Sequence, residues 1–109
     1  MNVHGHPVGG VDVGPETRCE HHHTARDVIA IRFRCCLTYY PCFACHETSA
    51  DHEAERWSRE QWDREAVLCG VCGTELTIRE YLDSPARCPT CEATFNPGCV
   101  AHHDRYFEP

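Results

Sequence analysis

The sequence contains no lysine, so all ten of its basic residues are arginine. The 17 acidic residues outnumber them, and the formal net charge is −7. Proteins that bind nucleic acid without sequence preference depend on a basic surface. The charge balance therefore argues against a nucleic-acid partner.

Long apolar stretches are also absent, and no run has the length of a transmembrane helix. The first residues lack the positive and apolar segments of a secretory signal peptide. We therefore expect a cytoplasmic protein that does not bind membranes. In a reducing compartment its ten cysteines would stay reduced, which favours metal binding over disulfide bonds.

Large apolar side chains are few, with two Trp, four Tyr, four Phe and one Met among 109 residues. A chain of this size rarely builds a stable core unaided, and many small domains add metals. The sequence predicts one such domain at residues 18–109, preceded by a flexible tail at residues 1–17. The tail is expected because this segment has four Gly, two Pro and no hydrophobic period.

Cysteine and histidine, by contrast, are abundant, and twelve of them between residues 19 and 91 recur at metal-ligand spacings. Structural zinc takes four such ligands in a tetrahedral arrangement. Twelve ligands therefore predict three zinc ions per chain.

The last four ligands form two Cys-x-x-Cys pairs separated by fifteen residues, the pattern of a zinc ribbon. We assign the third zinc to Cys69, Cys72, Cys88 and Cys91. A redox role for either pair is disfavoured, because each pair has the other as a partner.

The first eight ligands are predicted to form two interleaved sites. His46 directly follows Cys45 and cannot easily reach the metal that Cys45 binds, so the two serve different ions. The first zinc is assigned to Cys19, His21, Cys42 and Cys45. The second is assigned to Cys35, Cys36, His46 and His52. In an alternative division, Cys35 and Cys36 bind different ions.

A possible extra metal site lies near the C-terminus. Asn96 and Pro97 are typical of a helix start, and Cys99 and His103 lie four residues apart on that predicted helix. They could supply half of a fourth site. Alternatively, Cys99 is buried beneath the helix.

The predicted fold class is a small metal-stabilised α+β domain, with short strands, hairpins and helices around three zinc sites and little hydrophobic core. β-Branched residues predict a strand at 27–33, with a hairpin partner at 37–40. Ser58 and Gln61 have the spacing of a capping box, which predicts a helix at 59–64. Another strand is expected at 66–68 and another helix at 78–82.

Within the domain, we expect an interleaved two-zinc part at 18–55, a ribbon part at 66–95 and a C-terminal helix at 97–107. The whole chain is expected to be a monomer.

The ligand pattern resembles that of the CHY-type zinc finger family. The matching motifs are Cys19-x-His21, Cys35-Cys36, Tyr40-Pro41-Cys42-x-x-Cys45-His46, His52, Cys69-x-x-Cys72 and Cys88-x-x-Cys91. One departure is His22, where the family name implies Tyr. That Tyr is not expected to bind metal, so the metal prediction is unaffected.

The resemblance implies three zinc ions with the ligand division given above. In eukaryotes the finger occurs at the N-terminus of RING ubiquitin ligases, and alone in a small helper protein of the mitochondrial intermembrane space. That helper works with the disulfide relay and keeps its oxidoreductase free of zinc. No RING domain follows in this sequence, so ligase activity is not expected.

Three functions are considered. The leading hypothesis is a zinc-binding protein that acts as a protein-interaction module or zinc-handling helper, with another protein as partner. A thiol-redox accessory role would need a reactive cysteine outside a closed site, for which Cys99 is the candidate. A nucleic-acid-binding ribbon is the third. No enzyme is expected, because a catalytic zinc keeps one position open.

Overall fold

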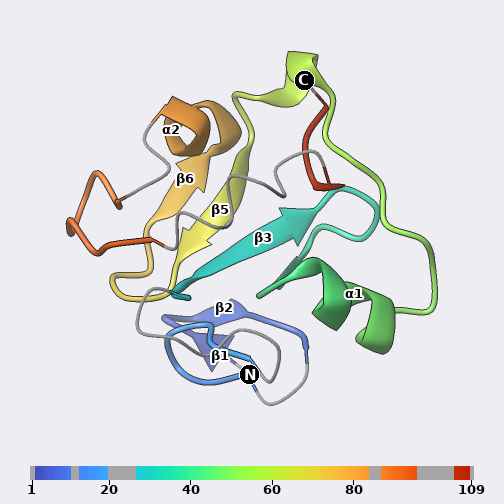
Figure 1. Cartoon of the computed structure of the whole chain (residues 1–109), viewed down its shortest axis with the longest axis horizontal. Coiled ribbons are helices and arrows are strands. Elements are labelled where there is room, and N and C mark those ends of the chain that lie inside the picture. Colours follow the sequence, from blue (N-terminus) through green and yellow to red (C-terminus); the bar gives the residue numbers. More distant parts are fainter. Residues whose placement is uncertain (1, 11–12, 20–26, 84–86, 96–104, 109) are drawn as a thin grey trace.

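The computed structural model of the protein is an α+β fold around a four-stranded antiparallel sheet (Figure 1). The structure describes residues 2–10, 13–19, 27–83, 87–95 and 105–108. The strand order is β4-β3-β5-β6. The strands are β3 at Ile29–Phe33, β4 at Thr38–Tyr40, β5 at Glu65–Cys69 and β6 at Glu75–Thr77. The predicted α+β class is confirmed.

Strand β3 is central to this sheet, and its side chains are covered on both faces. Ile31 lies opposite Tyr40 of β4 and opposite Val67 of β5. Alternation along β3 places Ile31 in the main core and its neighbour Ala30 in a second cluster on the other face. The predicted strand and hairpin are confirmed, and the strand begins at Ile29.

The structure describes three short helical segments, two between β4 and β5 and one after β6. They are α1 at Phe43–Ser49, a 3₁₀ helix at Arg59–Gln61 and α2 at Ile78–Asp83. The predicted capping box is present, because the side chain of Gln61 accepts a hydrogen bond of 3.0 Å from the Ser58 backbone. However, only one 3₁₀ turn forms where a helix to residue 64 was expected. No helix in the described ranges is long and apolar enough to cross a membrane.

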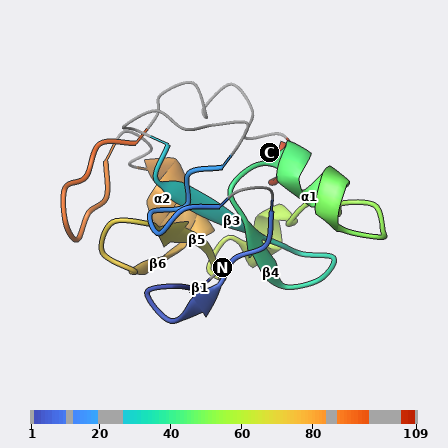
Figure 2. The same ribbon diagram turned by 90° about the horizontal axis from the view of Figure 1, so that it is seen from below.

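The start of the chain forms a hairpin, which the sequence did not predict. Strands β1 (Asn2–Val3) and β2 (His6–Pro7) pair with each other and lie beside the main sheet (Figure 1 and Figure 2). Val3 and Val8 are buried, and they pack against the face of the sheet opposite the main core. At residues 2–10 the chain therefore forms a packed cover instead of the expected flexible tail. The apolar residues of this segment are too few to show a hydrophobic period in the sequence.

Side-chain and backbone bonds hold this cover in place. The Gly9 amide donates to the Tyr39 carbonyl over 2.9 Å. The His4 ring lies with its Nε2 3.0 Å from the carbonyl oxygen of Gly70, and Glu75 contacts His6 at 3.2 Å. The N-terminal segment thus contacts both edge strands of the sheet, β4 and β6.

The other end of the chain docks beside Trp57. The Trp57 amide donates to the Tyr106 carbonyl at 2.8 Å, and the Glu108 amide donates to the Trp57 carbonyl at 2.7 Å. The Trp57 indole also donates to the Arg32 carbonyl at 2.7 Å. Most of the predicted C-terminal helix, 97–107, lies outside the described residues.

Gly70 provides a test of the contact between the N-terminal segment and the sheet. A Cβ at Gly70 would overlap the carbonyl oxygen of Glu16, a backbone atom that cannot move aside cheaply. A Cβ at Gly14 would meet nothing closer than 3.8 Å. We expect Gly70→Ala to lower the free energy of unfolding by about 1–3 kcal/mol through overpacking. The matched Gly14→Ala change should shift it by less than about 1 kcal/mol.

Denaturant unfolding of the zinc-loaded variants measures both values. Equal effects of the two substitutions would contradict the close contact at Gly70.

Candidate metal centres

The Cys and His side chains gather into three clusters, and within each cluster the potential ligand atoms lie within 4.8 Å of one another. The turn cluster contains Cys35, Cys36, His46 and His52. The ribbon cluster contains Cys69, Cys72, Cys88 and Cys91. The buried cluster contains Cys19, Cys42 and Cys45. These groups are the predicted ones, except that the predicted His21 lies outside the described residues.

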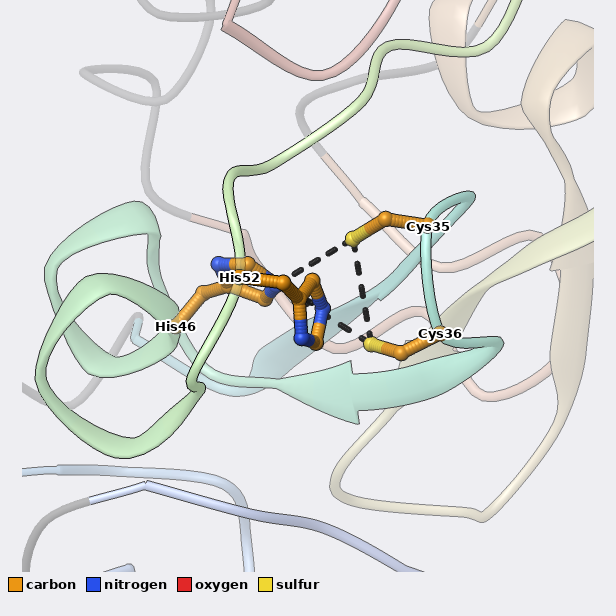
Figure 3. Close-up of side chains that lie close together, drawn as sticks. All are labelled: Cys35, Cys36, His46 and His52. Atoms are coloured by element: carbon orange, nitrogen blue, oxygen red, sulfur yellow. Dashed lines mark hydrogen bonds between the residues drawn. The ribbon is translucent and has the colours of Figure 1, made fainter.

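The turn cluster joins three consecutive pieces of the chain (Figure 3). Cys35 and Cys36 lie in the turn between β3 and β4, His46 projects from α1, and His52 follows α1. The His46 ring is buried and stacks on Phe33 with ring centroids 4.3 Å apart. Its Nε2 lies 3.2 Å from Cys35 Sγ and 3.3 Å from His52 Nε2. The structure thus brings both cysteines into one cluster, and their assignment to a single ion belongs to the proposed ligand division.

The separations in the turn cluster match the edges of a tetrahedron around zinc. Zn–S bonds of about 2.3 Å and Zn–N bonds of about 2.0–2.1 Å place two sulfurs about 3.8 Å apart and two nitrogens about 3.3 Å apart. The two sulfurs of the turn cluster are separated by 3.9 Å and the two nitrogens by 3.3 Å. A disulfide bond would require the two sulfurs to be about 2.05 Å apart. Their actual separation instead fits two ligands of one metal ion.

The ribbon cluster has the same spacing. Cys69 and Cys91 have sulfurs 3.7 Å apart, and those of Cys72 and Cys88 are 3.8 Å apart. Cys69 ends β5, and the amide of Gly73 donates to its carbonyl at 2.8 Å, which closes the turn. Gly73 has a φ of 80°, a left-handed conformation that favours glycine.

The buried cluster contains three closely spaced cysteines. The sulfurs of Cys19 and Cys42 are 3.8 Å apart, and the Cys45 amide donates to the Cys42 sulfur at 3.3 Å. All three cysteines are buried. Gly10 lies against the cluster, because a Cβ there would be 2.9 Å from the Cys45 sulfur. Three thiolates can fill three of the four positions around a zinc ion, so zinc here needs one more ligand.

Burial controls the protonation of the metal-free thiols. A hydrogen bond with Cys19, together with burial, raises the pKa of the Cys42 thiol far above its usual range. Burial also raises the pKa of Cys69. At Cys72, burial opposes ionisation, but hydrogen bonds from the Thr74 side chain and backbone outweigh it and lower the pKa to about 6. Zinc must therefore displace protons from Cys42 and Cys69, whereas Cys72 offers a ready thiolate.

The two histidines of the turn cluster lie in different electrostatic environments. Burial and the neighbouring His52 lower the pKa of His46, which favours the neutral imidazole that binds metals. Asp51 Oδ1 lies 3.1 Å from His52 Nδ1, and this hydrogen bond is the main reason for the raised pKa of His52. A carboxylate in this position fixes the tautomer that presents Nε2 to a metal.

The donor types and their tetrahedral spacings fit three zinc ions. They define a small zinc-binding protein. The chain belongs to the CHY zinc finger family, which it matches over residues 19–81.

Similar proteins occur in yeasts. Helper of Tim protein 13 of Kluyveromyces lactis is 46% identical over 95 residues, which cover 87% of this chain and 82% of that protein. Helper of Tim protein 13 of Saccharomyces cerevisiae is 43% identical over 102 residues, which cover 91% and 88%. An uncharacterized protein of Schizosaccharomyces pombe is 40% identical over 101 residues, which cover 93% and 88%. No solved structure matches the chain significantly.

These relatives correct one expectation, the cytoplasmic location. Two of them carry the name Helper of Tim protein 13 and align with nearly the whole chain. The family resemblance places the small stand-alone helper in the mitochondrial intermembrane space. The cytoplasmic prediction followed from the missing signal peptide and is wrong on this comparison.

Two predicted site elements lie outside the described residues. They are His21, expected to complete the first zinc site, and the possible extra pair of Cys99 and His103. The described clusters account for the other eleven predicted ligands.

A mutation series can identify the fourth ligand of the buried cluster. We expect His21→Ala to reduce the zinc content from three ions to two, or to make one ion markedly easier to remove, because three thiolates leave one corner of the tetrahedron open. His22→Ala and His23→Ala are matched controls and should retain three ions. Native mass spectrometry counts the ions. A full zinc complement in His21→Ala, held as tightly as in the unchanged protein, would contradict the assignment.

Acid is expected to remove zinc. Zinc-bound thiolates carry no protons, whereas released cysteines bind them, and the raised pKa values of Cys42 and Cys69 extend this competition to neutral pH. The released state binds more protons, so it is favoured as the pH falls. At a fixed chelator concentration, bound zinc should decrease steadily from about pH 7 to about pH 4. A pH-independent zinc content would argue against thiolate ligands.

Proposed function

We propose that this protein is a zinc-handling helper that holds two zinc ions firmly and exchanges a third with a partner protein. The exchangeable ion lies in the turn cluster. The observation that carries the proposal is the unequal burial of the three clusters. The three described cysteines of the buried cluster are inaccessible, whereas His52 of the turn cluster is exposed and Cys35 and Cys36 are half-buried.

The ligand types also favour faster zinc exchange at the turn cluster than at the ribbon cluster. The turn cluster offers two thiolates and two neutral histidines, while the ribbon cluster offers four thiolates. Thiolates are soft, anionic ligands well suited to zinc. Cys91 of the ribbon cluster is exposed, but its three partner thiolates would retain the ion. We therefore assign slow exchange to the ribbon and buried clusters.

The proposed ligand sets follow these clusters. Each of the turn and ribbon clusters supplies four ligands to one ion, and His21 joins the buried cluster. All three sets are then closed, which leaves no coordination position for a substrate water. We propose no catalytic role.

The names of the relatives support a protein partner, since they are called helpers of a Tim protein. The family resemblance adds that the stand-alone helper keeps a thiol oxidoreductase free of zinc. In such a role the turn cluster would receive an ion that blocks the partner's thiols. A redox role of its own would depend on Cys99, since the other nine cysteines all lie in the clusters.

Zinc release to an excess of a chromogenic chelator tests the proposal. We expect two phases, with one ion released at least about tenfold faster than the other two, a barrier difference of ~1.4 kcal/mol. Cys36→Ser should abolish the fast phase. The matched variant Cys72→Ser in the ribbon cluster should leave it intact. Release of all three ions at one rate, or loss of the fast phase only in Cys72→Ser, would refute the assignment.

A further inference from the structure

A pocket of about 440 Å³ opens beside the two cysteines of the turn cluster. Its lining residues are Arg34, Cys35, Cys36, Leu37, Trp57, Gln61 and Arg64. The pocket is shallow and open to solvent. We propose that a small anionic thiol binds in this pocket and opens the turn cluster by ligand exchange. The proposal rests on exchange at the turn cluster, and it names the class of molecule that regulates it.

The charge of the pocket selects an anion. Apart from the cysteines, its charged lining residues are two arginines, Arg34 and Arg64, and it contains no carboxylate. Two other pockets on the described surface each include glutamates, such as Glu47 in one and Glu55 in the other. In a chain with a net charge of −7, two arginines beside a metal cluster form a local positive site, although one of them, Arg34, is paired with Glu55.

Both guanidinium groups can turn to an incoming anion. Arg34 contacts Glu55 at 3.3 Å and Gln61 at 3.1 Å, both on the surface. Exposed ion pairs of this kind contribute little stability, so Arg34 can exchange its partner at low cost. Arg64 is exposed, and among the described residues its guanidinium makes no hydrogen bond or ion pair.

The turn that carries the two cysteines is strained. Leu37 follows them with a φ of 53°, in the left-handed region that a γ-branched residue rarely adopts. Its side chain is 58% exposed, although it is large and apolar. Strain of this kind persists only while the surroundings hold the backbone in place. Release of one sulfur from zinc would let the turn relax, which favours exchange at Cys35 or Cys36.

A thiol is the chemical class that this exchange requires. With zinc bound, the sulfur of the incoming thiol would replace that of Cys35 or Cys36 as a ligand, and the proton of the thiol would pass to the departing cysteine sulfur. This exchange transfers no electrons and leaves the total charge unchanged. A carboxylate alone would be a poorer competitor, because thiolate is the softer ligand. The carboxylates of the thiol instead contact the arginines.

The other two clusters are poor sites for the same reaction. Four thiolates around one zinc ion give the ribbon cluster a formal charge of about −2, which repels an anionic thiol. The described sulfurs of the buried cluster are inaccessible. Thiol-assisted release is therefore confined to one ion.

The test uses the full zinc-loaded chain, a chromogenic chelator as zinc acceptor, and glutathione as the anionic thiol. Glutathione diethyl ester is the control, because it has the same thiol without the carboxylates. We expect glutathione to accelerate the fast phase of zinc release at least about fivefold more than the ester does, an effect that should decrease with salt. In cadmium-loaded protein, whose NMR shifts depend on the number of sulfur ligands, glutathione should alter the resonance of the site with two sulfurs.

Arginine variants test the pocket itself. Arg64→Gln should reduce the acceleration by glutathione at least about threefold and leave the response to the ester unchanged, because only the carboxylates contact the arginine. Arg64→Lys should restore most of the effect. Arg79→Gln is the matched control, since Arg79 is an exposed arginine outside the pocket, paired with Asp63 at 3.1 Å.

Three results would overturn the inference: equal acceleration by glutathione and its ester, an unchanged response in Arg64→Gln, or a glutathione effect on the site with four sulfurs. A fast phase of zinc release whose rate does not change when thiol is added would refute this inference. The proposed function would be unaffected by that result. The absence of any fast phase without thiol would instead refute the proposed function. The comparison of glutathione with its ester is made on the unchanged protein, so it does not depend on the folding of a variant.

Discussion

The structure depends on the tetrahedral geometry of zinc, which requires four donors at fixed separations from segments that are apart in the sequence. The turn cluster fixes the β3–β4 turn to α1, and the ribbon cluster fixes the end of β5 to the segment at 87–95. The sheet is too small to hold these segments by itself. Metal coordination therefore determines how the short elements meet, and the apolar core fills the space between them.

The metal ligands could be predicted from the sequence because their spacing is a local property. A Cys-x-x-Cys pair can point both sulfurs at one metal, and the adjacency of Cys45 and His46 favours two different ions. The structure places the eleven described ligands in the predicted groups. Strand β3 was equally predictable, because β-branched residues favour a strand and Ile29 and Ile31 lie in the core.

The N-terminal hairpin could not be predicted in the same way. Its stability comes from contacts with residues far along the chain, such as His4 with Gly70, and two buried valines give no period. Helix α1 was missed for a related reason. Its N-cap is Cys42, whose sulfur accepts the capping hydrogen bond in place of the usual side-chain oxygen. Because none of the usual N-cap residues is present, the Cys-x-x-Cys sequence was interpreted only as a metal motif. The proposed relation between the burial of a cluster and its rate of zinc exchange could not be predicted from the sequence. Ligand spacing does not show which cysteines are buried.

The hairpin has a consequence for how the chain matures during synthesis. Residues 2–10 are synthesised well before their partners Tyr39, Gly70 and Glu75. The turn cluster is complete once residue 52 has emerged, whereas the cover over Cys45 needs the later strands to hold it. A nascent chain can thus bind metal at the turn cluster while residues 2–10 still lack their partners, so this early segment is among the last to fold.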